Sequence, residues 1–173
     1  RHVSVPICIY DNPRTTHRIF SDALVERIAS LANIASIKIP GLPDDQVGVR
    51  VATLRQLVPQ RVSIGVSGDA FAVAGLNAGC NLWYSVCGGL FPEIAQNITA
   101  AALSGDRQLA SVLSERLEPL WALFRLHGSL KVIAAAASIL ELTEVECLPR
   151  PLVSLSAEAI NEVKSVMDKL GLR

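Results

Sequence analysis

Residues 34–41 read Ile-Ala-Ser-Ile-Lys-Ile-Pro-Gly, and this stretch decides the fold class. Residues 34–39 have the length and apolar character of one buried strand, and Pro40-Gly41 ends it. Similar stretches lie at residues 5–10, 62–66 and 82–86, and a helical pattern follows each of them. Short apolar strands that alternate with helices indicate a parallel α/β sheet that is buried on both faces.

The helices are predicted from apolar residues that recur every three or four positions. Ser21 and Ser156 are typical N-cap residues, and Gly171 is a typical residue after a helix end. Residues 11–13, Asp-Asn-Pro, predict a loop. The predicted helices cover residues 21–31, 47–58, 70–78, a stretch starting at Pro92, 107–126 with a break or a tolerated proline at Pro119, 130–142 and 156–170.

The composition narrows the function classes. The chain has 173 residues, half of them apolar, and a formal net charge of zero, so nucleic acid and an anionic membrane are not expected partners. The longest uncharged apolar stretch, residues 132–140, is too short to span a bilayer. No signal-peptide pattern opens the chain, which makes the cytoplasm the expected location. The four cysteines form no CxxC pair and no histidines gather near them, so no metal site is predicted.

Lys38 is the residue that stands out, because it lies near the end of a strand predicted to be buried. Lysine is rarely buried without a reason, and burial disfavours its charged form, which leaves a nucleophilic amine. Catalytic groups of parallel barrels lie at such strand ends. The alternative is that Lys38 ends the strand and extends its amine into solvent.

Other residues at the strand ends form the rest of a candidate site. Tyr10 closes the preceding strand, so its phenol is predicted at the same edge as Lys38, where it could move a proton; a core tyrosine is the alternative. The rim segments Ser67-Gly68-Asp69 and Ser85-Val86 follow the other two strands, and glycine there lets a ligand approach the backbone. Asp69 could equally be a helix N-cap.

These segments together resemble the dihydrodipicolinate synthase / N-acetylneuraminate lyase family. The resemblance rests on Ile9-Tyr10-Asp11-Asn12-Pro13, on Lys38 twenty-eight positions after the tyrosine, and on the two rim segments. It continues through Lys131 and through Leu148-Pro149-Arg150-Pro151-Leu152 before the last helix, so it covers essentially the whole chain.

The resemblance implies the C-terminal half of a (β/α)₈ TIM barrel with a C-terminal helical extension. Residues 1–105 would hold strands five to eight and residues 106–173 the helical region, and the first half of the barrel would be absent from this chain. Family members are usually homotetramers built as pairs of dimers, so a homo-oligomer, dimer or tetramer, is expected. They need no metal or organic cofactor.

The same resemblance implies the chemistry. Lys38 would match the lysine that forms a Schiff base with pyruvate or another 2-keto acid, and Tyr10 the tyrosine that relays protons. Ser67, Gly68, Asp69, Ser85 and Val86 would line the substrate, and Arg14 and Thr15 would also contact it. The family's synthases carry an arginine where this chain has Thr15, with Arg14 one place earlier, and the family's Gly-Thr-Thr-Gly-Glu-like segment has no match. A divergent member acting on another 2-keto acid or sugar acid is therefore expected.

Three functions stay open at this stage. The first is a Schiff-base-forming aldolase or lyase, and the second is a dehydratase of a keto-deoxy sugar acid that works through the same imine. The third is an inactive fragment or non-catalytic relative, because half a barrel leaves sheet edges unpaired.

Overall fold

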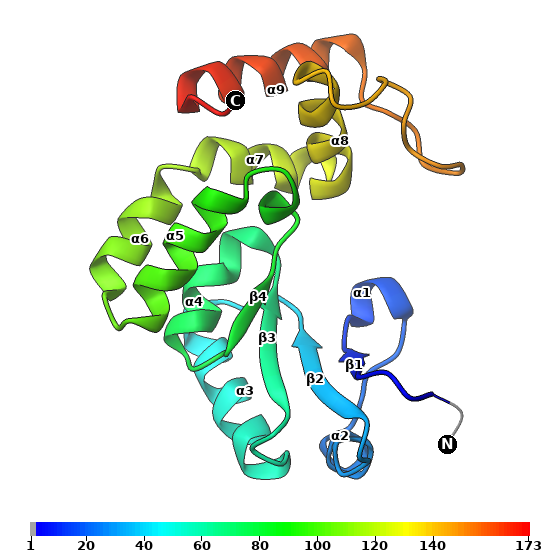
Figure 1. The fold of residues 1–173 in the computed structure, drawn as a ribbon, viewed down its shortest axis with the longest axis vertical. Coiled ribbons are helices and arrows are strands. Elements are labelled where there is room, and N and C mark those ends of the chain that lie inside the picture. Colours follow the sequence, from blue (N-terminus) through cyan, green and yellow to red (C-terminus); the bar gives the residue numbers. More distant parts are fainter. Residues whose placement is uncertain (1–2) are drawn as a thin grey trace. The chain divides into compact units, whose positions relative to one another are not determined.

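The computed structural model describes residues 3–173, which form two compact units (Figure 1). The sheet unit comprises the chain up to Ser85 together with Thr99–Arg107. The helical unit comprises Val86–Ile98 and Gln108–Arg173. The predicted division near residue 105, and the numbering of the strands as five to eight of a barrel, stay predictions.

Four parallel strands make up the sheet of the sheet unit. They are β1 (Ile7–Tyr10), β2 (Ile34–Ile39), β3 (Ser63–Ser67) and β4 (Leu82–Tyr84), in the order β1-β2-β3-β4. Parallel neighbours need a crossover connection, and the helices between the strands supply it. The predicted parallel α/β class is confirmed. The carboxyl ends of all four strands meet at one edge of the sheet, which we call the carboxyl rim.

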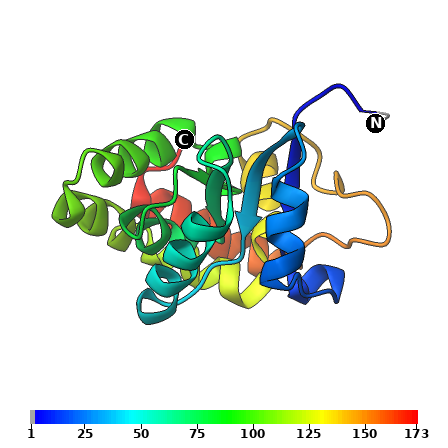
Figure 2. The ribbon, with the colours of Figure 1, turned by 90° about the horizontal axis from the view of Figure 1, so that it is seen from below.

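One face of the sheet packs against helices. Ser21 caps α2 (Asp22–Ala29) by accepting a hydrogen bond from the N–H of Leu24 at 3.3 Å. Figure 2 shows α2, in blue, against the strands, and α3 (Asp44–Leu57) and α4 (Ala72–Asn77) complete the layer. The buried core between sheet and helices includes Ile9, Val25, Ala29, Ile37, Ile39, Val47, Val51, Leu54, Ile64, Val66 and Cys80.

The opposite face of the sheet is polar rather than apolar. Cys8 pairs with Ser36 and Tyr10 with Lys38, so these four side chains share this face, and all are exposed or half-buried. The prediction that both faces are buried is therefore wrong for this chain. Strand residues alternate between faces, and in β2 the isoleucines at positions 37 and 39 take the helix-covered face while Ser36 and Lys38 take the other.

Arg61 binds the turn between α2 and the amino end of β2. Its guanidinium donates to the carbonyl oxygens of Ala29 at 2.9 Å, Leu31 at 2.9 Å and Ile34 at 2.5 Å. These carbonyls belong to the last turn of α2, to the connection and to the first residue of β2. A helix end leaves such carbonyls without partners inside the helix, so one side chain stabilises the whole turn.

Several predicted boundaries need correction. The predicted loop at residues 11–13 runs into a short helix, α1 (Pro13–Thr16), and the helix predicted from residue 47 starts at Asp44. The helix predicted over residues 70–78 is a 3₁₀ turn, η1 (Asp69–Phe71), followed by α4. The helical stretch predicted over residues 107–126 is two helices, which is the break that the sequence left open at Pro119; this proline stands in the first turn of the second helix, where its missing N–H is harmless.

The helical unit contains η2 (Cys87–Gly89), part of α5 (Pro92–Leu103), α6 (Arg107–Glu115), α7 (Glu118–His127), α8 (Ser129–Ile139) and α9 (Ala157–Leu170). Helices α7, α8 and α9 pack together, and their buried side chains include Leu120, Trp121, Val132, Ala136, Val163 and Met167. The indole N–H of Trp121 donates to the carbonyl oxygen of Ser114 at 3.1 Å. The predicted caps of α9, Ser156 and Gly171, are both confirmed.

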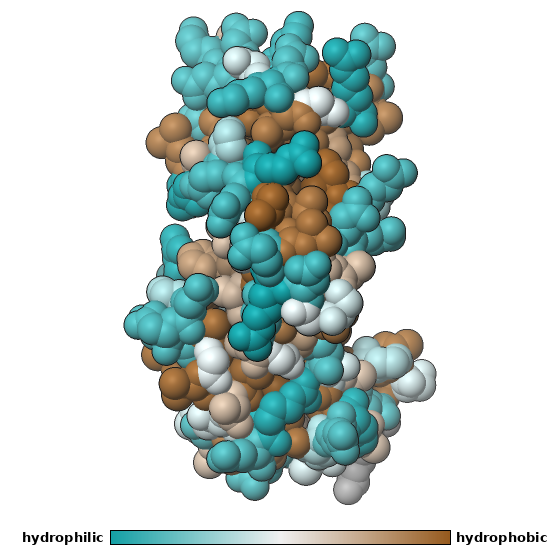
Figure 3. Space-filling model, turned by 90° about the vertical axis from the view of Figure 1, so that its left-hand side faces the viewer, coloured by the Kyte–Doolittle hydropathy of each residue, from teal (hydrophilic) through white to brown (hydrophobic). Residues whose placement is uncertain are grey.

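The surface is mixed in character. Figure 3 shows one face on which hydrophilic side chains surround apolar ones. In the helical unit Leu126 and Leu142 are 71% and 68% exposed. Across residues 3–173, no single helix has both the length and the hydropathy of a membrane span, and α7 and α8 reach them only as a pair bent by 117°.

Candidate active site

The carboxyl rim brings the predicted amine and phenol together. Tyr10 is the last residue of β1, Lys38 is the last but one of β2, and the two are register partners. The Nζ atom of Lys38 lies 4.9 Å from the centroid of the Tyr10 ring, and Lys38 is half-buried. Proximity follows from the register, because parallel partners extend their side chains from the same face. The roles assigned to them stay predictions.

Asn12 orients the Tyr10 phenol. Its side-chain N–H donates to the Tyr10 hydroxyl oxygen at 2.7 Å. Tyr10 is 41% exposed, so its hydroxyl stands where solvent and a small molecule can reach it. Because the oxygen accepts from Asn12, the phenolic proton is left to point in another direction. The sequence motif around Tyr10 thus has a local structural use.

Tyr84, the last residue of β4, is a neighbour of Lys38 that the sequence reasoning missed. The centroid of its ring lies 5.4 Å from Nζ of Lys38, so two aromatic rings flank the amine. Cations are attracted to the faces of aromatic rings at such distances. The sequence did contain a signal. Tyr84 is two residues after Leu82, so both side chains lie on the face that Lys38 and Gly65 share by register.

The hydroxyl of Tyr84 is held by two side chains from other strands. It forms a hydrogen bond with Ser36 Oγ at 2.5 Å and lies 3.2 Å from the Cys8 sulfur. Burial raises the pKa of the Tyr84 phenol above its usual value, with the Cys8 contact acting in the same direction and the Ser36 hydrogen bond opposing it. Tyr84 is therefore a neutral phenol near neutral pH.

Gly65 provides the room for the Tyr84 ring. It pairs with Lys38 on one side and with Leu82 on the other. A Cβ atom at Gly65 would lie 2.5 Å from Cε2 of Tyr84 and 2.6 Å from Cδ1 of Leu82, closer than real side chains approach. A side chain at this position would therefore displace the ring beside Lys38.

The rim segments after β3 and β4 form a second polar group. Ser67 Oγ donates to the carbonyl oxygen of Ile39 at 2.8 Å, and Ser85 Oγ donates to the buried carboxylate of Asp69 at 2.8 Å. Gly68 has a φ of 83°, a conformation that favours glycine. Asp69 is not an N-cap, because Gly68 occupies that position and Asp69 is the first residue of η1.

The remaining predicted substrate contacts lie elsewhere. Arg14 and Thr15 are exposed residues of α1, and the N–H of Thr15 donates to the carbonyl oxygen of Asn12 at 3.0 Å. Val86 belongs to the helical unit, where it precedes η2. The part of Arg14, Thr15 and Val86 in substrate binding stays a prediction.

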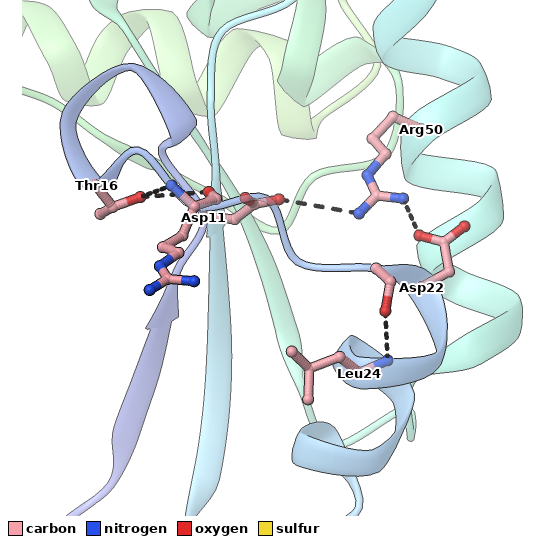
Figure 4. Close-up of polar contacts among 7 residues, drawn as sticks. Asp11, Thr16, Asp22, Leu24 and Arg50 are labelled. Carbon is pink, nitrogen blue, oxygen red and sulfur yellow. Dashed lines mark hydrogen bonds and ion pairs between the residues drawn. The ribbon is translucent and has the colours of Figure 1, made fainter.

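An ionic cluster connects the segment directly after β1 with helices α2 and α3 (Figure 4). Arg50 of α3 lies 2.5 Å from Asp22 of α2 and 3.9 Å from the buried carboxylate of Asp11. Burial raises the pKa of Asp11, Arg50 opposes this, and the negative charge of Asp22 adds to it. The Oδ1 atom of Asp11 has no hydrogen-bond partner among the residues that the structure describes.

No group of three or more His, Cys, Asp and Glu side chains within residues 3–173 has a geometry that could hold a metal ion. The side chains at the carboxyl rim supply a primary amine, two phenols, hydroxyls and a carboxylate. An amine beside a phenol can attack a carbonyl group while the phenol exchanges a proton.

A parallel sheet with an amine and a phenol at its carboxyl rim has the arrangement of an α/β-barrel protein with its site at the strand ends. Comparison with known sequences then gives the particular family. The sequence profile described as "Dihydrodipicolinate synthetase family" matches residues 1–170. The chain belongs to this family.

Individual relatives agree with this assignment. The chain is 29% identical to the 4-hydroxy-tetrahydrodipicolinate synthase of Desulforamulus reducens over 170 residues. This match covers 98% of this chain and 56% of the relative. The crystal structure of dihydrodipicolinate synthase from Agrobacterium tumefaciens superposes with a TM-score of 0.91 at 39% identity, over 97% of this chain and 56% of that one. The chain therefore has the fold of about half of such a barrel.

A third structure shares the fold. The chloride-inhibited dihydrodipicolinate synthase from Acinetobacter baumannii, solved in complex with pyruvate, has a TM-score of 0.87 at 19% identity, over 99% of this chain and 57% of that one. The chain spans little more than half the length of the relatives that it matches.

Proposed function

We propose that this chain carries the amine-bearing part of a Schiff-base-forming lyase that acts on pyruvate or a related 2-keto acid. Lys38 is the imine-forming amine and Tyr10 is the proton relay. The observation that carries the proposal is the pairing of these two residues at the carboxyl rim, with Nζ 4.9 Å from the phenol ring. Membership of the dihydrodipicolinate synthetase family supports it.

The chemistry follows from the two groups. The Lys38 nitrogen attacks the keto carbon, and the carbonyl oxygen leaves as water once it has gained protons, so that a C=N bond replaces C=O. The protonated imine then draws electrons from an adjacent C–C or C–H bond. Tyr10, held by Asn12 at 2.7 Å, gives a proton to the departing oxygen and recovers one later.

The substrate contacts are the less direct part of the proposal. Ser67, Gly68, Asp69 and Ser85 lie at the same rim and would line the substrate. Arg14, Thr15 and Val86 would contribute from the segments beside it. A homo-oligomer, dimer or tetramer, and a cytoplasmic location complete the proposal.

A non-catalytic role is the second candidate, favoured by one observation. The chain spans 56% of a curated relative's length, and catalysis on a rim needs a closed, water-poor pocket. In that case the chain would bind a keto acid weakly or serve in assembly only.

Borohydride trapping tests these alternatives. Intact mass of the purified protein first shows its true length. Incubation with pyruvate and borohydride, then with a panel of 2-keto acids, is expected to give a reduced adduct on the peptide with Lys38. Lys38→Ala should abolish the adduct, while Lys164→Ala, which changes an exposed lysine of α9, should not.

The products separate the remaining possibilities. Carbon–carbon cleavage identifies an aldolase-type lyase, whereas loss of water from a keto-deoxy sugar acid identifies a dehydratase. The absence of any adduct in a protein of the relatives' length would contradict the Schiff-base mechanism. An adduct without turnover would favour the non-catalytic role.

A further inference from the structure

We infer that Tyr84 is a positioning residue that holds the Lys38 amine together with Tyr10. The inference deepens the proposed function, on which its catalytic meaning rests. Nζ of Lys38 lies 4.9 Å from the Tyr10 centroid and 5.4 Å from the Tyr84 centroid. The amine thus lies close to one ring from β1 and one ring from β4.

The Tyr84 side chain crosses β3 to reach its partners. Tyr84 is on β4, yet its hydroxyl bonds to Ser36 on β2 and contacts Cys8 on β1. Strand β3 lies between β2 and β4, and the ring passes over Gly65, where a Cβ would lie 2.5 Å from it. The lack of a side chain at Gly65 is what allows this crossing.

The two phenols differ in what their hydroxyls can do. The hydroxyl of Tyr84 is engaged with Ser36 and Cys8 on the polar face of the sheet. That of Tyr10 accepts from Asn12 and is at the more exposed end. Tyr84 therefore fixes the amine by its ring, while the proton-transfer role falls to Tyr10.

Chemical labelling of the four lysines tests the inference without any substrate. The full protein is treated with acetic anhydride over a range of pH, and acetylation of Lys38 is measured by peptide mass relative to the exposed Lys164. In Tyr84→Leu, the loss of the ring removes a cation–π contact of the Lys38 amine. It also removes a group that restricts the access of the reagent to this amine. Labelling of Lys38 near neutral pH should rise about 2- to 30-fold, the range that such a contact covers.

Two variants separate the ring from its surroundings. Tyr84→Phe keeps the ring and should retain the wild-type labelling profile, whereas Gly65→Ala keeps the tyrosine but displaces it and should behave like Tyr84→Leu. Trp83→Leu is the matched control, because Trp83 neighbours Tyr84 in β4 but packs against the helix-covered core. It should leave the labelling of Lys38 unchanged.

Trapping with pyruvate and borohydride adds the functional readout. Tyr84→Leu should slow adduct formation by about 10²-fold, because a misplaced amine meets the keto carbon in a poor geometry, even as unselective labelling rises. Wild-type labelling of Lys38 in Tyr84→Leu, or an equal rise in Trp83→Leu, would overturn the inference. If pyruvate gives no adduct with the wild-type protein, the proposed function fails, while the labelling still decides the role of Tyr84.

Discussion

The backbone N–H of Asp11 donates a hydrogen bond of 3.0 Å to the carbonyl oxygen of Lys38. This bond continues the β1–β2 ladder one residue past Tyr10, so the backbone that carries the amine is held on the side of the phenol. The Asp11 carboxylate is buried near Arg50. A substitution of Asp11 that shifts its backbone would therefore also shift the backbone of Lys38.

Asp11→Asn is expected to change how stability depends on pH. Burial raises the pKa of Asp11 in the folded protein above its ordinary value, so the folded state favours the protonated acid. As pH rises from below the ordinary value through the raised pKa, this residue makes the free energy of unfolding fall. The asparagine stays neutral, so its advantage over the wild type should grow across that window and then level off.

Urea denaturation of both proteins at several pH values measures this difference. Asp22→Asn is a useful control, because Asp22 is exposed while it contacts the same arginine. A stability difference between wild type and Asp11→Asn that does not vary with pH would contradict the assignment of a raised pKa.

Tyr10→Phe should slow both imine formation and turnover without removing the amine. The phenylalanine keeps the ring beside Lys38 but loses the hydroxyl that Asn12 orients. If the proposed function holds, kcat should fall by about 10²–10⁴-fold, the usual contribution of a positioned acid–base group, and the borohydride adduct at Lys38 should form more slowly but still form. Lys38→Ala should abolish both and leave the fold, as judged by circular dichroism. Near-normal turnover in Lys38→Ala would rule out the Schiff-base mechanism.

Alanine substitutions at two helical glycines should change the stability of the protein in opposite directions. Gly48 of α3 has open space where a Cβ would stand, so Gly48→Ala should stabilise the protein by about 0.5–1 kcal/mol through helix propensity. Gly75 of α4 packs on Val66, 2.5 Å from where its Cβ would be, so Gly75→Ala should destabilise by about 1–3 kcal/mol. Thermal and urea unfolding give both values, and equal effects of the two substitutions would contradict the close packing of α4 on β3.

Ser85→Ala should weaken the carboxyl rim. Its hydroxyl donates to the buried Asp69 carboxylate at 2.8 Å, and removing one donor from a buried charged acceptor costs about 1–3 kcal/mol. Ser104→Ala removes a hydroxyl that, just after α5, donates to the nearby carbonyl oxygen of Ala101, and it should have a small effect. The unfolding free energies of the two variants test the point, and equal losses would argue against a structural role for the Ser85–Asp69 bond.

Local sequence patterns were enough for most of the fold. Strand β2 was predicted over its whole length, because its apolar residues end abruptly at Pro40-Gly41. Strand β4 was predicted two residues too long, since Ser85 and Val86 continue an apolar run but leave the sheet. The break before α7 lies at Pro119, where the sequence left a break open, whereas the short helix α1 follows loop-type residues that do not predict it.

The candidate site was predictable only where a residue is unusual in its own strand. Lys38 is a charge in an apolar strand and Tyr10 ends its strand, so both were found. Tyr84 looks like an ordinary strand aromatic, and its place beside Lys38 depends on the missing side chain of Gly65 on a different strand. The burial of Lys38 was overestimated because the polar face of the sheet was not recognised.

Arg61 gathers the carbonyls of the α2–β2 turn at the end of the strands far from Lys38. Its bonds depend on the backbone of that turn and on no side chain of the carboxyl rim. Residues of the carboxyl rim can therefore be exchanged without removing the hydrogen bonds that Arg61 makes at the other end. The carboxyl ends of the strands can thus vary in sequence, while the hydrogen bonds at their amino ends preserve the ability of the chain to fold.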